Sequence, residues 1–411
     1  MAITWSAPLA NDRLLIAILA GALGGVLAGW WFGPAMVAWG WVGNLFLDAL
    51  KMTILPLVVT AIISGVAPLG AAHTVGRTGI ITGAFIIIST LVATTTGVFM
   101  AGIMEPGVGT SGLAAATPAD LATADASIES LVRTVVSPNL VAAAGDGQIL
   151  PIMLFALLLA LALSASGARG QPVIDLAEGL NEALMRLIGW ILYLSPIGIF
   201  ALLAARFGAL GGEGFWREIT SVGRYVATVG AGLSIHFLTL GALLILAGTR
   251  PHDYALNFLR ALVTAFGTGS SAATLPVAMD CAQQAGVRAA VVKFVLPLGT
   301  ALNRNGTALY QATAAMFIAQ VYAVDLSFAQ QGVVIVTAAL AGISTAGVPQ
   351  HGIVTLVIVL TAVGLPAEGI GLIVAVDWFL DRCRTVINVW GNGVGAVLVD
   401  RLAGQIHKSG G

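Results

Sequence analysis

The sequence predicts an all-helical integral membrane protein with many spans. Hydrophobic residues make up 58% of the 411 residues, only 9% are charged, and the mean hydropathy is +0.96. A soluble domain carries roughly 25% charged residues, so the composition argues against one. Several apolar segments also exceed the ~18 residues that suggest a membrane-spanning helix. The net charge of −1 gives no reason to expect a nucleic-acid partner.

The first 250 residues divide into long apolar segments. The segment after Arg13 lacks a signal-peptide pattern, so we expect it to be retained as the first span. A cluster of tryptophans follows it, where an aromatic belt at the membrane surface is expected: Trp30, Trp31, Trp39 and Trp41. The expected helical spans are 12–32, 40–70, 78–104, 148–166, 173–208 and 216–248.

The distribution of charge predicts that both termini are cytoplasmic. With the N-terminus inside, the acidic connection 105–130 lies outside, as the positive-inside rule favours. Arg206 and Arg217 fall outside, against the rule. The basic residues that fall inside, if 254–286 is a re-entrant hairpin, are His73, Arg77, Arg169, Arg250, His252, Arg260, Arg288, Lys293, Arg401 and Lys408.

From 254 to 403 the apolar segments are interrupted by Gly, Ser, Thr, Asn and Pro. Irregular backbone at membrane depth is tolerated only where protein or a watery cavity covers it, so this half is expected to hold the functional site. Two tips rich in small residues, "GTGSSAATLPVA" (267–278) and "AGISTAGVPQHG" (341–352), lie in matching places. Paired interruptions of this kind indicate a transporter binding site. The alternative is two ordinary loops between shorter helices.

The segment "DWFLDRCRTVINVWGN" (377–392) places polar groups on one helix face. That face holds Asp377, Asp381, Arg384 with Thr385, Asn388 and Asn392. Ionisable groups within a span are expensive and usually face a cavity and each other. An acid and a guanidinium one turn apart suit a zwitterion, since the acid takes an ammonium and the arginine a carboxylate. The alternative is an ion-pair ladder that joins two helices.

The segment "PLGTALNRNGTALYQ" (297–311) is expected to interrupt a span. Asn303, Asn305, Gly306 and Thr307 would unwind the helix and expose carbonyl oxygens, which hard cations bind. Arg304 lies between the two asparagines and would repel a cation. No metal-ligand cluster or nucleophile–base set stands out, so an enzyme is not expected, and Cys281 and Cys383 are expected to be small buried residues. Ser89, Thr90 and the threonines 94–96 are candidates to line the same cavity, although hydroxyls bonded to the i−4 carbonyl are expected for most of them.

Nearly the whole chain resembles the dicarboxylate/amino acid:cation symporter, or glutamate transporter, family, in a prokaryotic-type form. The segments that carry the resemblance are "GQILP" (147–151), "SPIGIFAL" (195–202), "SSAATLP" (270–276), "GTALYQ" (306–311), "STAGVP" (344–349) and "DWFLDRCRTVINV" (377–389). The resemblance implies a homotrimer with eight transmembrane helices, two re-entrant helical hairpins and inverted repeats. A mobile transport domain would move as an elevator against a trimerisation scaffold.

The implied division of the chain follows these roles. The scaffold would comprise residues 1–76, with spans 1 and 2, and residues 129–215, with spans 4 and 5. The transport domain would comprise 77–128 with span 3 and an outside loop, 216–253 with span 6, the first hairpin 254–286, span 7 at 287–323, the second hairpin and gate 324–368, and span 8 with the tail at 369–411.

The resemblance also assigns substrate contacts. Asp381 matches the acid that takes the substrate ammonium, and Arg384 matches the arginine that takes the side-chain carboxylate of aspartate or glutamate. Arg382 matches a position where some members carry the arginine beside the substrate, and Gly269 occupies the other place for that arginine. The remaining expected contacts are Ser271, Thr307, Gly347, Val348, Thr385 and Asn388.

The chain departs from the family at its cation sites. Arg304 and Asn305 stand where sodium-coupled members have a methionine and an aspartate, beside Asn303, and Asn392 stands where they have a second aspartate. Gln311 replaces the glutamate of the proton- and potassium-coupled animal members. We therefore expect no sodium requirement and no bound metal. A proton carried by Asp377 or Asp381, or uncoupled exchange, remains open.

The expected function is transport of L-aspartate or L-glutamate across the inner (plasma) membrane by a homotrimer embedded in the lipid bilayer. The alternatives within the family are a C4-dicarboxylate transporter, which the acid at Asp381 disfavours, a transporter of neutral amino acids, which Arg384 disfavours, and a carrier that is still sodium-coupled. An anion channel is the alternative from another class of protein.

Overall fold

The structure is a computed structural model and describes residues 7–71, 77–109, 136–146, 148–344 and 352–405. Helices dominate the described residues, and no strand occurs among them. The expectation of an all-helical chain is therefore confirmed for this part of the sequence.

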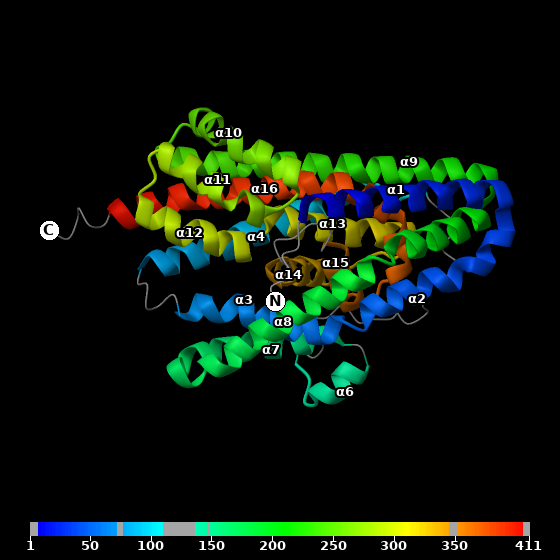
Figure 1. Ribbon diagram of the computed structural model, residues 1–411, viewed down its shortest axis with the longest axis horizontal. Coiled ribbons are helices and arrows are strands. Elements are labelled where there is room, and N and C mark those ends of the chain that lie inside the picture. The colour runs from blue at the N-terminus through cyan, green and yellow to red at the C-terminus, as the bar shows by residue number, and fades with distance from the viewer. Residues whose placement is uncertain (1–6, 72–76, 110–135, 147, 345–351, 406–411) are drawn as a thin grey trace.

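The first half of the chain forms helices of 6 to 52 residues, of which α1 and α9 run side by side along the long axis of the molecule in Figure 1. Their bounds are α1 (Ala7–Phe32), α2 (Gly40–Lys51), α3 (Ile54–Ala71), α4 (Arg77–Met104), α6 (Leu140–Gly145), α7 (Ile149–Ala165), α8 (Gln171–Leu192) and α9 (Ser195–Leu246), with the short 3₁₀ helices η1 (Gly33–Trp39) and η5 (Gly167–Arg169) between them. The four tryptophans expected at a membrane surface are all exposed at and around η1.

The second half has shorter helices followed by one long helix. Their bounds are α10 (Pro251–Thr268), α11 (Ser271–Gln284), α12 (Ala289–Leu302), α13 (Asn305–Val321), α14 (Phe328–Ser344), α15 (Gly352–Ala362), η6 (Ala367–Gly369) and α16 (Ile370–Gln405). Helices α10 and α11 pack as one hairpin and α14 and α15 as another. Each interrupted segment predicted from the sequence thus contains two helices that pack on each other, while their re-entrant position in a membrane stays a prediction.

Two of the expected spans differ from the helices observed. The span expected at 40–70 is broken between α2 and α3, and the one expected at 173–208 ends at Leu192 and restarts at Ser195. Pro196, in the first turn of α9, lacks the backbone N–H that a continuous helix would need. Conversely, α9 runs through the expected gap at 209–215 because no proline interrupts its 52 residues after the first turn. The domain boundary at 215/216 falls inside this helix and stays a prediction.

Three helical stretches in the described residues are long and apolar enough to cross a membrane: Ile16–Ala67, Thr78–Met104 and Ile219–Leu246. The bent pair Gln171–Ile191 and Ser195–Ala209 makes a fourth if it counts as one span. This supports a membrane protein without reaching the eight spans expected. Helices α11 to α15 are each shorter than 18 residues, so length and composition alone do not identify them as spans.

Helices α1 and α9 lie side by side along a seam of small residues (Figure 1). An added Cβ would lie 2.4 Å from the Pro196 carbonyl oxygen at Gly21 and 2.5 Å from that of Phe200 at Gly25. Gly29 continues the seam one turn further. Glycines four residues apart let helix backbones approach this closely, as in membrane helix pairs.

Helix α13 lies at the centre of the fold and is buried along almost its whole length. Helices α4 and α16 pack on it, and the two hairpins flank the same helices. The interruption between α12 and α13 is thereby enclosed by protein, as irregular backbone at membrane depth requires. Cys281 is buried as expected, whereas Cys383 is only half-buried because it lies on the partly open side of α16.

Candidate functional site

The interruption between α12 and α13 is stabilised by α16. Asn303 (φ −92°, ψ 85°) and Arg304 (φ −113°, ψ 57°) leave the helical conformation, as the sequence predicted. The Asn388 side-chain oxygen accepts hydrogen bonds from the backbone N–H groups of Gly306 (2.8 Å) and Thr307 (3.4 Å) at the start of α13. Its amide nitrogen donates to Thr307 Oγ1 at 3.2 Å. A side chain of α16 therefore satisfies donors that the broken helix leaves without partners.

A glycine is required at this crossing. A Cβ at position 306 would lie 2.4 Å from the backbone oxygen of Arg384, so only Gly306 lets the first turn of α13 touch α16. This contact brings the polar face of α16 against the interruption. The sequence "NGT" thus positions the site as well as opening the helix.

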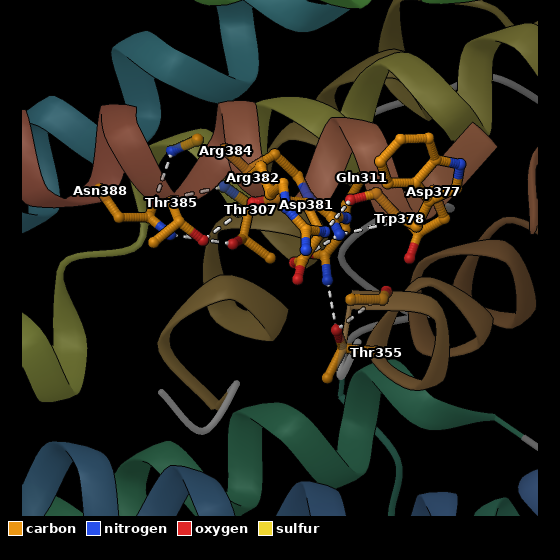
Figure 2. Close-up of polar contacts among 12 residues, drawn as sticks. Thr307, Gln311, Thr355, Asp377, Trp378, Asp381, Arg382, Arg384, Thr385 and Asn388 are labelled. Carbon is orange, nitrogen blue, oxygen red and sulfur yellow. Dashed lines mark hydrogen bonds and ion pairs between the residues drawn. The ribbon is translucent and has the colours of Figure 1, made fainter. Parts of the chain in front are cut away.

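Arg384 is the centre of the charged face of α16, which Figure 2 shows. Its Nη2 atom lies 2.7 Å from Asp381 Oδ1, with a hydrogen bond, and 3.1 Å from Asp377 Oδ1. Its guanidinium carbon lies 3.9 Å from the centre of the Tyr310 ring on α13, in a cation–π contact. Both ion pairs join residues of α16 itself, so they do not form the ladder between two helices that was the alternative.

Two donor atoms of Arg384 have no hydrogen-bond partner. Nε and Nη1 are buried and unpaired, although the residue is 0% exposed. Nη1 faces the start of α15, where a Cβ on Gly352 would lie 2.4 Å from it. Buried unpaired donors of a charged group carry a desolvation penalty of ~1–3 kcal/mol or more. A carboxylate oxygen that accepts a hydrogen bond from either donor would reduce that penalty.

The tip of the first hairpin lies against the same face. Gly269 has a left-handed φ of +60°, and a Cβ there would lie 3.7 Å from Asp381 Oδ2 and 4.0 Å from Arg382 Cγ. Arg382 donates to the Trp378 backbone oxygen at 3.1 Å, and its guanidinium lies 5.5 Å from the Trp378 ring centre. The two positions that the family resemblance links, 269 and 382, are therefore neighbours in space.

Ser271 is also close to this tip. It begins α11, directly after the N-cap Ser270, whose side chain accepts from the Ala273 N–H. The Ser271 hydroxyl is buried and has no hydrogen-bond partner. An unpaired hydroxyl at a helix N-terminus fits the predicted contact with an anionic group.

The three asparagines of the expected cation sites meet α4 in what we call the amide cluster, formed by Asn303, Asn305, Asn392, Ser89 and Thr90. Asn303 Nδ2 donates to Asn392 Oδ1 at 3.1 Å, while the Asn303 oxygen accepts from Ser89 at 3.2 Å. The Asn305 oxygen accepts from Thr90 at 3.0 Å. All five residues are buried, and no carboxylate belongs to the cluster. Ser89 and Thr90 also lie within hydrogen-bond distance of the Ile86 backbone oxygen, at 3.3 and 2.7 Å, so each hydroxyl shares its one proton between that oxygen and an amide oxygen.

Arg304 adds a positive charge beside this cluster. It is 5% exposed, its Nη2 donates to the Thr300 backbone oxygen at 2.8 Å, and it interacts electrostatically with Asp381. Its Nε atom is buried without a hydrogen-bond partner. The hydrogen bond to Thr300 holds the guanidinium against the last turn of α12.

Gln311 and Thr355 connect α13 to the second hairpin. The Gln311 amide nitrogen donates to the Thr355 hydroxyl of α15, which Figure 2 shows across from α16. The side-chain oxygen of Gln311, Oε1, is buried and has no hydrogen-bond partner. Gln311 thereby joins the central helix to the hairpin predicted to act as a gate.

The structure brings most of the predicted residues together. Asp377, Asp381, Arg382, Arg384, Thr385, Asn388 and Asn392 share α16, and Ser271, Asn303, Arg304, Asn305, Thr307 and Gln311 lie around it. The Thr385 hydroxyl donates a hydrogen bond to the Asp381 backbone oxygen at 2.8 Å. Gly347 and Val348 lie outside the described residues. The roles of all these residues in binding stay predictions.

Sequence reasoning missed Tyr310 and Thr355. Tyr310 lies within the segment 297–311, and Thr355 follows the segment 341–352. Neither residue type indicates a binding site by itself, because a tyrosine or a threonine in an apolar helix ordinarily has a structural role. Thr94 and Thr96 bond the carbonyl oxygens four residues earlier, as expected. Only Ser89 and Thr90 of that segment reach the site.

Comparison with known proteins shows the family of the chain. Residues 14–402 match the model of the sodium:dicarboxylate symporter family. The chain is 35% identical over 416 residues to excitatory amino acid transporter 3 of Mus musculus, which covers 88% of this chain and 78% of the relative. It is 34% identical to neutral amino acid transporter B(0) of Oryctolagus cuniculus, over 94% of this chain and 77% of the relative. A putative sodium-dependent excitatory amino acid transporter of Caenorhabditis elegans, glt-4, is also 34% identical, over 90% of this chain and 84% of the relative.

Proposed function

The chain belongs to the sodium:dicarboxylate symporter family, a family of transporters and not of enzymes, and we propose that it carries acidic amino acids without requiring sodium. The observation that supports this most strongly is the pairing of Asp381 with Arg384, whose remaining donors are buried and unpaired. The relatives named for excitatory amino acids support the same substrate class.

Each charged group of aspartate or glutamate has a complement at this site. The ammonium would pair with Asp381, and the side-chain carboxylate would accept a hydrogen bond from Nε or Nη1 of Arg384, the two donors that lack a partner. The Ser271 hydroxyl at the start of α11 would meet the α-carboxylate. Because Arg384 already contacts Asp381 at 2.7 Å, the substrate would replace an internal ion pair by two external ones.

Two alternative substrate classes fit less well. A C4-dicarboxylate has no ammonium, so it would leave Asp381 facing an anion in a site of low dielectric. A neutral amino acid would leave the Nε and Nη1 donors of Arg384 without an acceptor, although a relative is named for neutral substrates. Each alternative therefore leaves a polar group of the site without a complement on the substrate.

Independence from sodium is supported by the amide cluster. Sodium needs several oxygen ligands, usually with carboxylates among them. Here the amide oxygens lie within hydrogen-bond distance of the Ser89 and Thr90 hydroxyls and of the Asn303 amide nitrogen, and the adjacent Arg304 supplies a fixed positive charge. We propose that this arginine stabilises the substrate site in place of bound cations. Substrate transport would then be coupled to a proton carried by Asp377 or Asp381, or would be uncoupled.

The wider mechanism is proposed on the same basis. The protein would be a homotrimer in the inner (plasma) membrane with eight spans, two re-entrant hairpins and cytoplasmic termini. Helices α4, α9 from 216 on, and α10 to α16 would form the moving transport domain. The hairpin α14–α15 would act as its gate, tied to α13 through Gln311 and Thr355.

Uptake of labelled L-aspartate into vesicles that contain the purified protein tests this function. We expect saturable uptake in choline salts, inhibited by L-glutamate and much less by succinate or alanine. Inhibition by succinate with no effect of L-glutamate would instead identify a dicarboxylate carrier. A conductance for anions that does not saturate and shows no stereoselectivity would identify a channel.

A further inference from the structure

The stretch of α16 that carries Asn392 has glycine at every second position, Gly391, Gly393 and Gly395. Glycine lowers the stability of a helix, so the intrinsic propensity of this stretch does little to fix its course. Nevertheless the Asn392 side chain must be placed accurately, because its oxygen accepts a hydrogen bond from Asn303 at 3.1 Å. The position of Asn392 therefore depends on what packs around these glycines.

Aromatic rings from two other helices fill the space beside the glycines. A Cβ on Gly393 would lie 2.7 Å from Cζ of Phe258, which belongs to α10. A Cβ on Gly395 would lie 2.5 Å from Cε1 of Phe85, which belongs to α4. Only a residue without a side chain admits the rings this closely, so the glycines are contact points of α16 with α10 and α4.

Four aromatic side chains, which we call the aromatic cluster, join α9, α10 and α16 at this level: Phe237, Tyr254, Phe258 and Trp390. The rings of Phe237 and Trp390 stack with 4.6 Å between their centres, and the Tyr254 ring lies 5.8 Å from that of Trp390. The Tyr254 hydroxyl donates to the Gly393 backbone oxygen at 2.8 Å, and Trp390 Nε1 donates to the Phe237 backbone oxygen at 3.1 Å. These two bonds fix α16 to α10 and to α9.

Helix α10 contacts α16 near both of its ends. Near its start Tyr254 binds Gly393, and at its end Gly269 lies against the Asp381 carboxylate, where a Cβ would be 3.7 Å from Oδ2. The 18 residues of α10 therefore run along α16 from the glycine-rich stretch to the acid of the substrate site. The first arm of the hairpin thus supports both parts of the polar face.

We propose that the aromatic cluster positions the substrate site, because Tyr254 and Trp390 hold Asn392 within reach of Asn303. The proposal rests on the function proposed above. Asn303 ends α12 and precedes the first turn of α13, which touches the backbone of Arg384. A shift of Asn392 therefore reaches the guanidinium through the junction of α12 and α13. Tyr254 and Trp390 are positioning residues, which act through Asn392 and not on the substrate itself.

Binding of L-aspartate to two conservative variants tests the proposal. Tyr254→Phe removes only a hydroxyl, and Trp390→Phe removes the indole N–H while it keeps an aromatic ring. Calorimetric titration in choline buffer should give a dissociation constant that is about three- to tenfold higher in each variant, the effect of losing one hydrogen bond between neutral groups. A loss of folded protein would lower the stoichiometry and leave the constant unchanged. Tyr193→Phe is the control, because Tyr193 is 49% exposed at the end of α8, and it should bind as the wild type does.

A double-mutant cycle shows whether the effect passes through Asn392. Asn392→Ala alone should weaken binding. Adding Tyr254→Phe to it should raise the dissociation constant by less than about twofold more, because the side chain that Tyr254 positions is then absent. If Asn392→Ala does not fold, the two single variants decide the question.

Three results would contradict these expectations. Unchanged affinity in Tyr254→Phe or in Trp390→Phe, even with a lower melting temperature, would overturn the proposal and leave the aromatic cluster with a structural role alone. Losses that multiply in the double variant would also overturn it, since Tyr254 would then act independently of Asn392. Absence of L-aspartate binding by the wild-type protein in choline would instead overturn the proposed function.

Discussion

Arg384 determines the chemistry of the site at the residue scale. Its guanidinium contacts Asp381, Asp377 and the ring of Tyr310 at once, so three neighbours fix its orientation. Tyr310 and Asp377 occupy one side of it, which leaves Nε and Nη1 as the donors without partners. A planar fork of donors held in this way suits a carboxylate, and a lysine would not reproduce it.

Arg384→Cys should shift the preference of the protein from acidic to neutral amino acids. Removing one partner of a buried, hydrogen-bonded charge pair costs ~2–5 kcal/mol, so the dissociation constant for L-aspartate should rise by roughly 30-fold or more. Calorimetric titration with L-aspartate and with L-serine measures both affinities. Arg250→Cys is the control, because that side chain is 89% exposed. Unchanged aspartate affinity in Arg384→Cys would contradict the assignment of acidic amino acids as substrates.

Arg304→Met should weaken aspartate binding without creating a need for sodium. The methionine removes the buried positive charge at the interruption between α12 and α13, but the amide cluster still contains no carboxylate. Adding Asn305→Asp and Asn392→Asp to this variant should yield binding that depends on sodium, because the carboxylates supply hard anionic ligands. Titrations in sodium and in choline buffers compare the single and triple variants. Full affinity of the single variant in choline would count against the role given to Arg304.

At the scale of elements, the site depends on where α13 begins and how α15 approaches it. Asn388 binds the two backbone N–H groups at the start of α13, and Gly352 lets α15 approach the Arg384 guanidinium. Neither residue carries charge. Each fixes the position of a helix end, and the two helix ends define the space around Arg384.

Asn388→Ala should destabilise the junction of α12 and α13. The substitution leaves buried N–H groups of Gly306 and Thr307 unsatisfied, which costs ~1–3 kcal/mol. The melting temperature of the purified protein without substrate should fall, and Asn257→Ala, on an exposed face of α10, should leave it unchanged. Equal melting temperatures for both variants would show that the junction does not need this side chain.

Gly352→Ala should disturb the second hairpin at the site. Its Cβ would lie 2.4 Å from Arg384 Nη1, so either the guanidinium or α15 must shift. Aspartate affinity should fall by about tenfold or more, equivalent to ~1.4 kcal/mol. Gly332→Ala is a matched control in the same hairpin, since nothing lies within 4 Å of a Cβ there. Equal loss in both variants would indicate a general effect of alanine in the hairpin.

The sequence predicts these elements unevenly. The interruption at 303–304 and the polar face of α16 follow from residue chemistry, because asparagine, glycine and paired charges are unusual in apolar segments, and both predictions are confirmed. The continuity of α9 through 209–215 was not predicted, since glycine pairs weaken a helix without ending it. The contacts of Tyr310 and Thr355 depend on how three helices meet, which no local pattern specifies.

At the scale of the whole molecule, the fold brings three far separated segments to one place. Helix α4 supplies hydroxyls, the α12–α13 interruption supplies amides and Arg304, and α16 supplies the acids and Arg384. The central claim is that Arg304, a residue of the chain, supplies the positive charge that bound cations would otherwise supply.

The most direct test is calorimetric titration of the purified wild-type protein with L-aspartate in sodium and in choline buffers of equal pH and ionic strength. The account predicts the same dissociation constant in both buffers, because the positive charge is part of the protein. Binding that appears only in sodium would contradict it, since the asparagine oxygens would then suffice as cation ligands despite Arg304.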